Sequence, residues 1–409
     1  MIRLDTIKAV YDRDVRPFVR ETPVYRGRGI STFAECNDLY FKMENLQRTG
    51  SFKIRGGCAR VAMLTEAERK RGVVTASAGN HAQGLALASS EARVPCRVVM
   101  PRTASNAKVE ATRSYGADVI LDGENFDEAV AVAKGIAEAE GRVFVSAYDD
   151  DGIITGQGSL GVELLEQLPD VDTVIIPIGG GGLFAGASCA LKEAKPGLRV
   201  IGVQAEGADA AARSFKAGHL VPRKLAVDTI ADGIAIKAPS ERTFRYIQRY
   251  ADDVVTVSDD AIAQAILLLL TRMKVLVEPS GAASLAALLE HKGLGQGRTI
   301  CLLCGGNMDL KLLADIIERG MIRQGRYLHI FTAVKDKPGG LAGLLEAVAS
   351  VGGNIMNVEH NRLASDVRYG ATGVELLVET RGADHATGIA KFLIEQGYPV
   401  RHIDHVGIQ

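Results

Sequence analysis

Three features that would place a chain in a special class are missing from this sequence of 409 residues. The longest apolar stretch, residues 261–270, has about half the length of a membrane span and lies between Asp260 and Arg272. The formal net charge is −1, which argues against binding to nucleic acid or to a membrane surface through charge. Residues 1–18 are charged throughout and lack the apolar core of a secretory signal. We therefore predict a cytoplasmic protein without a membrane or nucleic-acid partner.

Cysteine is also scarce. The six cysteines are too few for a disulfide scaffold in a chain of this length. Cys301 and Cys304 have CxxC spacing, but they lie in the apolar run TICLLC (299–304), which is typical of a β-strand. An offset of three residues places two side chains on opposite faces of a strand. The spacing therefore argues against a shared metal site or a local disulfide.

Between about residues 39 and 304, short β-branched runs alternate with segments whose apolar residues have helical spacing, such as 125–140 and 258–273. This alternation predicts an α/β fold with open parallel sheets and helices on both faces. Ligands of such folds bind at the carboxyl ends of the strands. The expected strands are 73–76, 96–101, 118–121, 142–146, 172–178, 199–203, 253–257 and 299–303.

The pattern changes near Gly320, where the polar segment 319–326 predicts a connector. The order that follows is βαββαβ, which predicts a separate domain with a four-stranded antiparallel sheet. We place this domain at 327–409, after a linker at 321–326 and a first part at 1–320. Its expected elements are strands at 327–334, 353–362, 372–380 and 398–403, and helices at 341–352 and 383–397.

The stretch TGSFKIRGG (49–57) places Lys53 beside a phenylalanine and between glycines, just before an apolar helical run. One interpretation is a solvated lysine at a loop–helix junction, the usual position of this residue type. The other is a chemical lysine, because burial lowers the pKa of an ammonium group and the free amine forms Schiff bases. The residues that follow the expected strands bear on this choice.

The first such segment is TASAGNHAQG (75–84), with small residues and the hydroxyl of Ser77 at the start of a helix. Free backbone N–H groups at a helix start bind anions, and the alternative is a Ser/Asn helix cap. In LLCGGNMD (302–309), Cys304 ends a strand, and the alternative is a buried structural cysteine.

The segment IPIGGGGLFAG (176–186) has four glycines between a strand and a helix, which lets the backbone approach a phosphate closely. It also fits the dinucleotide fingerprint Gly180-x-Gly182-x-x-Ala185, with Glu206 after the next strand. A nicotinamide enzyme would need only this segment. An enzyme that uses pyridoxal phosphate needs an amine, a phosphate loop, a partner for the ring nitrogen and a cradle for the substrate carboxylate. The combination indicates pyridoxal phosphate as the cofactor and Lys53 as the amine.

The motifs SFKIRGG, SAGNHAQG, GGGGL, TIADGIA (229–235), EPSGA (278–282) and CGGN occur in the order found in threonine dehydratases (threonine ammonia-lyases). The chain resembles this family of fold-type-II pyridoxal phosphate enzymes over residues 1–320. The resemblance implies two open parallel-sheet subdomains, a small one at about 42–145 and a large one that comprises the remainder. The tail, with DKPGGLAGLLEAVASVGGNI (336–355) and VEHNR (358–362), resembles an ACT domain, a regulatory module that often binds amino acids.

The resemblance also implies roles for single residues. Lys53 corresponds to the Schiff-base lysine, and residues 231–233 and Glu278 to segments that line the site. The cofactor-binding residues implied are Phe52, Lys53, Asn80, Gly179, Gly180, Gly181, Gly182, Leu183 and Cys304. The residues implied to hold the substrate carboxylate are Ser77, Gly79, Asn80 and His81.

Two positions depart from the patterns of relatives. Many relatives have serine at the position of Cys304, beside the ring nitrogen, and we expect function to survive because a thiol still makes a weak hydrogen bond. Serine racemases have a serine at the position of Ala78 that serves as a second acid or base. Alanine transfers no proton, so we expect an eliminating enzyme and not an efficient racemase.

Relatives bind a cation near 204–212, where this chain has only Glu206 and Asp209 as carboxylates, and we expect no metal site.

The expected reaction is conversion of L-threonine to 2-oxobutanoate and ammonia, and of L-serine to pyruvate, in isoleucine biosynthesis. The alternatives are a dehydratase for L-serine or threo-3-hydroxyaspartate, and a non-enzymatic amino-acid sensor. The resemblance implies a homo-oligomer, a dimer or a homotetramer. The tail either binds an effector such as isoleucine or valine, which makes the enzyme allosteric, or only builds the oligomer interface.

Overall fold

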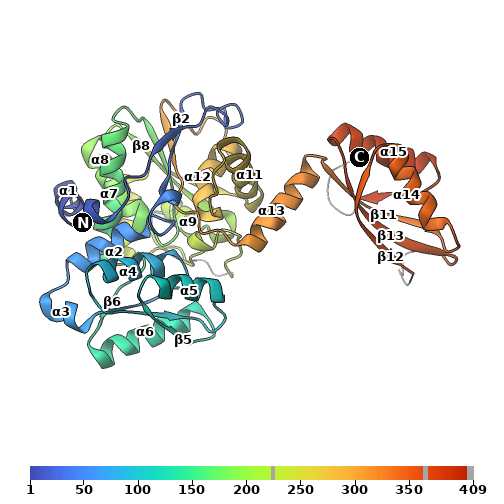
Figure 1. Cartoon of the computed structure of the whole chain (residues 1–409). Helices are drawn as coiled ribbons and strands as arrows, with labels where there is room; N and C mark the ends of the chain where they lie inside the picture. The colour runs from blue at the N-terminus through green and yellow to red at the C-terminus, as the bar shows by residue number, and fades with distance from the viewer. Residues whose placement is uncertain (223–225, 363–366, 403–409) are drawn as a thin grey trace. The chain divides into compact units, whose positions relative to one another are not determined.

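The computed structural model describes residues 1–222, 226–362 and 367–402. The chain divides into two compact units, Met1–Met308 and Asp309–Gln409. The first unit contains a six-stranded and a four-stranded sheet, and the second contains a four-stranded sheet (Figure 1). Among the described residues, no helix has both the length and the apolar content to cross a membrane.

The four-stranded sheet of the first unit is parallel throughout and has the order β5-β4-β3-β6. Val73 and Val98 face a core shared with helix α4 (Asn80–Glu91), whereas Val74 and Val99 face helix α6 (Phe126–Glu140). Helices therefore cover both faces, as predicted. The strands are β3 (Val73–Ala76), β4 (Cys96–Met100), β5 (Asp118–Leu121) and β6 (Val143–Phe144). The strand expected at 142–146 is shorter, although the Val145 N–H still donates to the Val74 carbonyl at 2.9 Å, and helix α7 (Asp151–Gln167) follows.

The six-stranded sheet has the order β1-β2-β10-β7-β8-β9, and only the edge strand β1 is antiparallel. Ile300 and Leu302 face a core shared with α7 and α8 (Gly182–Ala194). The thiol of Cys301 donates to the Ser284 carbonyl in α12 (Pro279–Glu290), on the other face. Cys301 and Cys304 are free thiols. The strands are β1 (Val24–Arg26), β2 (Leu39–Lys42), β7 (Thr173–Pro177), β8 (Arg199–Ala205), β9 (Asp253–Val257) and β10 (Thr299–Leu302).

Helices complete the first unit. The helix expected at 258–273 is correct over α11 (Asp259–Leu268), but residues Leu269–Met273 form a π-helical turn. The other helices are α1 (Leu4–Val10), α2 (Lys53–Ala62), α3 (Glu66–Arg71), α5 (Asn106–Ser114), α9 (Ala210–Ala217) and α10 (Glu241–Tyr250). A 3-10 turn, η3 (Glu44–Leu46), follows β2.

The second unit has the predicted βαββαβ order and an antiparallel sheet, β12-β13-β11-β14. Ile330 and Leu376 pack with Leu344 and Leu393 of its two covering helices. The elements are α13 (Leu310–Arg323), β11 (Tyr327–Lys335), α14 (Gly340–Ser350), β12 (Asn354–Asn361), β13 (Ala371–Glu379), α15 (Ala383–Glu395) and β14 (Arg401–His402). The connector expected at 319–326 is helical as far as Arg323. Residue 403 of the last expected strand lies outside the described residues.

Candidate active site

The segment before helix α2 is joined by backbone contacts to the segment that follows strand β10. The Phe52 N–H donates to the Cys304 carbonyl at 3.1 Å, and Ser51 forms an antiparallel bridge with Gly305. The Gly306 N–H donates to the Gly50 carbonyl at 2.8 Å. These bonds place the start of α2, where Lys53 lies, beside the carboxyl end of a central strand.

Lys53 has the electrostatic setting of a reactive amine. Burial lowers the pKa of its ammonium group to about 8, and the nearby Glu278 carboxylate opposes this shift only in part. Its Nζ lies 5.0 Å from the centroid of the Phe52 ring. A larger share of the neutral, nucleophilic amine is therefore present near neutral pH than for a solvated lysine. The structure thus favours the chemical lysine over the solvated one.

Asn80 begins helix α4 and joins a hydrogen-bonded chain of polar side chains. Its Nδ2 donates to both carboxylate oxygens of Glu278, at 2.8 and 3.0 Å. Its Oδ1 accepts from Asn307 Nδ2 at 2.7 Å, and Asn307 Nδ2 also donates to the Thr49 carbonyl at 2.9 Å. Burial raises the pKa of Glu278 to about 7, and the Asn80 hydrogen bonds counter that shift. Asn80 is thereby held at the same edge as Lys53.

The residues expected to hold a substrate carboxylate lie at the junction of β3 and α4. Ser77 Oγ accepts from the Gly79 N–H at 3.2 Å, and a Cβ on Gly79 would meet no described atom within 4 Å. His81 is 3% exposed, with Nε2 3.4 Å from the Val145 carbonyl oxygen. Burial is the main cause that lowers the pKa of His81, to about 3, so its ring is neutral. The start of α4 therefore offers backbone N–H groups beside open space.

The four glycines lie between β7 and α8. A Cβ on Gly180 would lie 2.3 Å from ring carbons of Tyr148, and Gly181 has φ of +91°. Thr243 Oγ1 donates to the Gly180 carbonyl at 2.8 Å and fixes the loop. Leu183, which follows the loop, is buried in the core. This loop therefore requires glycine and presents the start of α8 to an anion.

The glycine loop connects to the Lys53 side of the site through the segment 232–234 (Asp232–Ile234). A Cβ on Gly179 would lie 3.0 Å from Ile234 Cα. A Cβ on Gly233 would lie 2.7 Å from Ser280 Oγ and 3.8 Å from Glu278 Oε1. The contacts thus run from the glycine loop to Glu278, and from Glu278 to Asn80.

Cys304 is 4% exposed, and burial raises the pKa of its thiol well above the ordinary value. The neutral thiol donates to the Leu302 carbonyl at 3.5 Å. It can offer a ring nitrogen a weak hydrogen bond and no charge.

Several residues of the site were missed by sequence reasoning. Tyr148 follows a strand, so the rule that ligands lie after strand ends would have found it. Asn307 follows the Gly305–Gly306 pair in the same way. Thr243 and Ser280 lie in helices, where the sequence alone does not distinguish them from caps or core hydroxyls.

The arrangement fits an aldehyde that carries a phosphate. The glycine loop, whose close neighbours leave no room for side chains, precedes the start of α8, and Lys53 provides an amine of lowered pKa. Three buried polar atoms near Lys53 and Glu278 also lack a partner among the described residues: Ser51 Oγ, His81 Nδ1 and Ser280 Oγ. Buried polar groups are normally hydrogen-bonded, so a polar ligand bound here would supply the partners that these three atoms lack.

Residues 15–305 match the family described as pyridoxal-phosphate-dependent enzyme. The chain belongs to this family. The enzyme is 44% identical to the L-threonine ammonia-lyase of Thermotoga maritima over 401 residues, 98% of this chain and 99% of that protein. It resembles the processed form of threonine deaminase isoform 2 from Solanum lycopersicum, with a TM-score of 0.73 and 37% identity over 78% of this chain and 87% of that chain. Maize serine racemase has the same TM-score at 35% identity, over 78% of this chain and 98% of that one.

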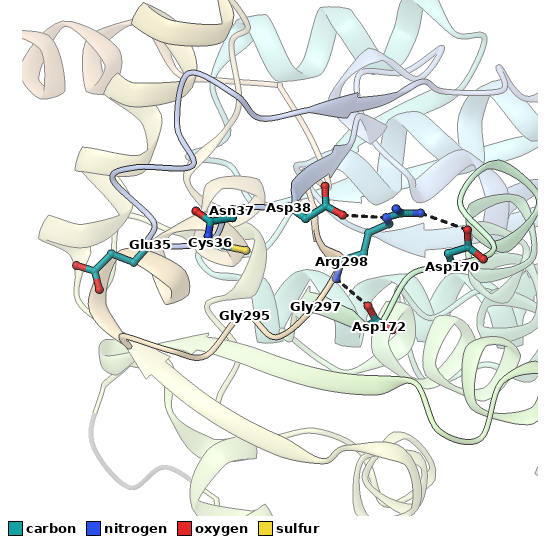
Figure 2. Close-up of a pocket in the computed structure, with 9 residues that line it drawn as sticks. All are labelled: Glu35, Cys36, Asn37, Asp38, Asp170, Asp172, Gly295, Gly297 and Arg298. Carbon is teal, nitrogen blue, oxygen red and sulfur yellow. Dashed lines mark hydrogen bonds and ion pairs between the residues drawn. The ribbon is translucent and has the colours of Figure 1, made fainter.

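The enzyme also has a cavity of about 610 Å³ that lies elsewhere (Figure 2). It adjoins the residues that precede β7 and β10, so it is at the opposite edge of the sheet from the glycine loop and Cys304. Arg298 spans it, donating through Nε to Asp38 at 3.0 Å and through its backbone N–H to Asp172 at 2.8 Å. Its acidic lining does not suit the phosphate of the cofactor.

Proposed function

We propose that this enzyme is an ammonia-lyase that converts L-threonine to 2-oxobutanoate and ammonia, and that also converts L-serine to pyruvate. The observation that carries the proposal is the amine of Lys53, which has a pKa lowered to about 8 and lies beside Cys304 and Glu278. The identity of 44% to a threonine ammonia-lyase over nearly the whole chain supports the substrate.

Each residue has a defined part in this proposal. Bound pyridoxal phosphate supplies an aldehyde for the substrate amine and a ring that accepts electrons from the Cα–H bond. Lys53 would take the Cα proton as general base. Asn80 would hold the ring oxygen, and Cys304 would partner the ring nitrogen. Phe52, the glycine loop with Leu183, and the substrate loop of Ser77, Gly79 and His81 complete the binding site.

The alternative substrates are L-serine and L-threo-3-hydroxyaspartate. The first experiment measures ketoacid formation from these and from L-threonine, with the absorbance spectrum of the purified enzyme. Threonine as the substrate of highest kcat/KM supports the proposal. Preference for serine or hydroxyaspartate keeps the chemistry and changes the substrate, and no ketoacid from any of the three contradicts it.

We propose further that residues 327–409 form an ACT-type regulatory domain, joined by a linker at 321–326 to a catalytic part at 1–320 with a small subdomain at 42–145. The βαββαβ order and the full-length match to the Thermotoga relative support this division. Isoleucine or valine is the proposed effector, and the proposed assembly is a cytoplasmic homotetramer in isoleucine biosynthesis. Assays with each amino acid, and the molar mass in solution, test these points.

A further inference from the structure

A group of buried charged side chains, one of them on helix α2, lies outside the cofactor site. We name it the Arg55 cluster, and it consists of Lys42, Glu44, Arg55 and Glu163. Arg55 donates from Nε and Nη2 to the two carboxylate oxygens of Glu44, each at 2.8 Å, and from Nη2 to Glu163 at 2.9 Å. Lys42 Nζ donates to Glu163 at 2.5 Å. No side chain of the four is more than 1% exposed.

Such a cluster requires an explanation beyond stability. Two cations balance two carboxylates, yet buried ion pairs lose so much hydration that apolar side chains often serve stability equally well. What an ion pair supplies in addition is direction. The guanidinium of Arg55 and the carboxylate of Glu44 meet through two parallel hydrogen bonds, which fix both position and orientation.

Helix α2 needs such an external anchor. Among the described residues, no side chain caps its start. Gly56 and Gly57 follow in its first turns, and glycine weakens a helix. Both are required by close neighbours, because a Cβ on Gly56 would lie 2.4 Å from Gln157 Nε2 and one on Gly57 would lie 2.8 Å from the Gly84 carbonyl oxygen. The helix that carries Lys53 is therefore held by its surroundings.

Hydrogen bonds hold the start of α2 to the end of β10 on both sides of Lys53 and Cys304. On one side, Phe52 bonds directly to the Cys304 carbonyl. On the other side, Arg55 bonds to Glu44, whose neighbours bond to the end of β10: the Leu303 N–H donates to the Lys42 carbonyl at 3.0 Å, and the Asn45 N–H donates to the Leu303 carbonyl at 2.9 Å. These two sets of bonds thus fix both sides of the start of α2 against the strand end that carries Cys304.

We propose that Arg55 is a positioning residue for Lys53, and that its paired bonds to Glu44 set where the Lys53 amine stands relative to Cys304 and the bound cofactor. The inference rests on the proposed role of Lys53. Arg55 acts through the backbone of α2, two residues after Lys53.

The test compares two conservative changes on the same helix. Arg55→Lys keeps the charge but loses the forked geometry, and Glu44→Asp keeps the carboxylate but moves it by one methylene. Arg60→Lys is the matched control, because Arg60 also lies on α2 and its Nε donates to Asp150 at 2.8 Å, outside the cluster. All variants are studied as full-length enzyme loaded with pyridoxal phosphate.

Three quantities are measured for each variant. They are kcat and KM for L-threonine, the pH midpoint of the absorbance change of the bound cofactor, and the peptide that carries the cofactor after borohydride reduction. We expect Arg55→Lys and Glu44→Asp to lower kcat about tenfold, to leave KM within about threefold and to shift the absorbance midpoint. Arg60→Lys stays within about twofold of the wild type in kcat. The double variant Arg55→Lys/Glu44→Asp loses no more than the worse single one, because both changes break the same pair.

The outcomes separate the two claims. The positioning role is overturned if Arg55→Lys and Glu44→Asp both keep the wild-type absorbance midpoint and kcat. If the label is then still on Lys53, the role of Lys53 remains intact. Label on another residue in the wild type overturns both. If Arg55→Lys accumulates unfolded, the milder Glu44→Asp decides alone, by the same midpoint and kcat.

Discussion

The side-chain amide of Asn80 donates to both oxygens of the buried Glu278 carboxylate, at 2.8 and 3.0 Å. The pair joins the start of α4 to the start of α12, and Glu278 faces the ammonium of Lys53 as well as the carboxylate of Asp232. Burial outweighs these bonds and raises the pKa of Glu278 from 4.5 to about 7. Protonation of Glu278 near neutral pH therefore turns one of the two oxygens that accept from Asn80 into a hydroxyl group.

The first prediction concerns stability and pH. A carboxyl group whose pKa is raised by folding favours the folded state while it is protonated, and that contribution is lost as the pH rises from the unfolded to the folded pKa. The free energy of unfolding of the cofactor-free wild type should therefore fall by about 3 kcal/mol relative to Glu278→Gln between pH 4.5 and 7. Denaturant titrations across this range measure the difference, and a difference independent of pH would refute the raised pKa.

The second prediction concerns the glycine loop. Gly180→Ala places a Cβ 2.3 Å from the Tyr148 ring, so the loop or the ring must move. We expect a loss of about 1–3 kcal/mol in the free energy of unfolding and weaker binding of pyridoxal phosphate. Thermal unfolding and cofactor titration measure the two effects.

Gly135→Ala is the control for this change. Gly135 lies in α6, and a Cβ there meets no described atom within 4 Å. Alanine at this position should stabilise the protein by up to about 1 kcal/mol and leave cofactor binding unchanged. If Gly180→Ala and Gly135→Ala had the same effects on the free energy of unfolding and on cofactor binding, the contact of Gly180 with Tyr148 would be unimportant.

The third prediction concerns Cys304. Glu278 and Glu44 both act to raise the pKa of its thiol, so Cys304→Asp brings a third carboxylate into their neighbourhood. A carboxylate at the ring nitrogen favours a protonated ring, which we expect to slow elimination and to convert more cofactor to its amine form. Cys304→Ser should keep the wild-type ratio of the two outcomes. Analysis of products and cofactor after turnover measures the ratio of ketoacid to amine-form cofactor. The wild-type ratio in Cys304→Asp would count against the role of Cys304 as an uncharged partner of the ring nitrogen.

The fourth prediction concerns Ala78, which follows Ser77 at the substrate loop. A methyl side chain transfers no proton, so the enzyme should form pyruvate from L-serine with little D-serine. Chiral chromatography of the reaction mixture tests this. D-serine formed at a rate comparable to that of pyruvate would show that another residue supplies the second proton.

Local pattern was sufficient to predict much of the fold. β-Branched runs located the strands of the four-stranded parallel sheet and four strands of the six-stranded sheet, but not β1 and β2. Alternation of strand and helix predicted helices on both faces, as Val73 and Val74 show by facing different cores. The end of β6 and the π-helical turn after Leu268 were not predicted, because they depend on hydrogen bonds and packing that local sequence does not show. The sequence predicts a connector at 319–323, where the structure has helix, because Gly320 and the polar residues around it resemble a linker.

The site was predictable where chemistry requires a particular residue type. Gly180 and Gly181 are needed because a Cβ or a negative φ would not fit, and Lys53 stands out by its neighbours. Tyr148 and Asn307 follow strands β6 and β10, which local sequence indicates, but their contacts with Gly180 and Asn80 join distant segments and are seen only in the folded chain. The Arg55 cluster joins three segments, residues 42–44, helix α2 and helix α7, so only the folded chain shows it.

The most direct test of the account is the position of the covalently held cofactor. The enzyme is reduced with borohydride in the presence of pyridoxal phosphate, digested and mapped by mass spectrometry, and turnover of L-threonine is measured for Lys53→Ala. The account predicts the label on Lys53 and a loss of nearly all 2-oxobutanoate formation in Lys53→Ala. A label on a different lysine, or wild-type turnover in Lys53→Ala, would contradict it.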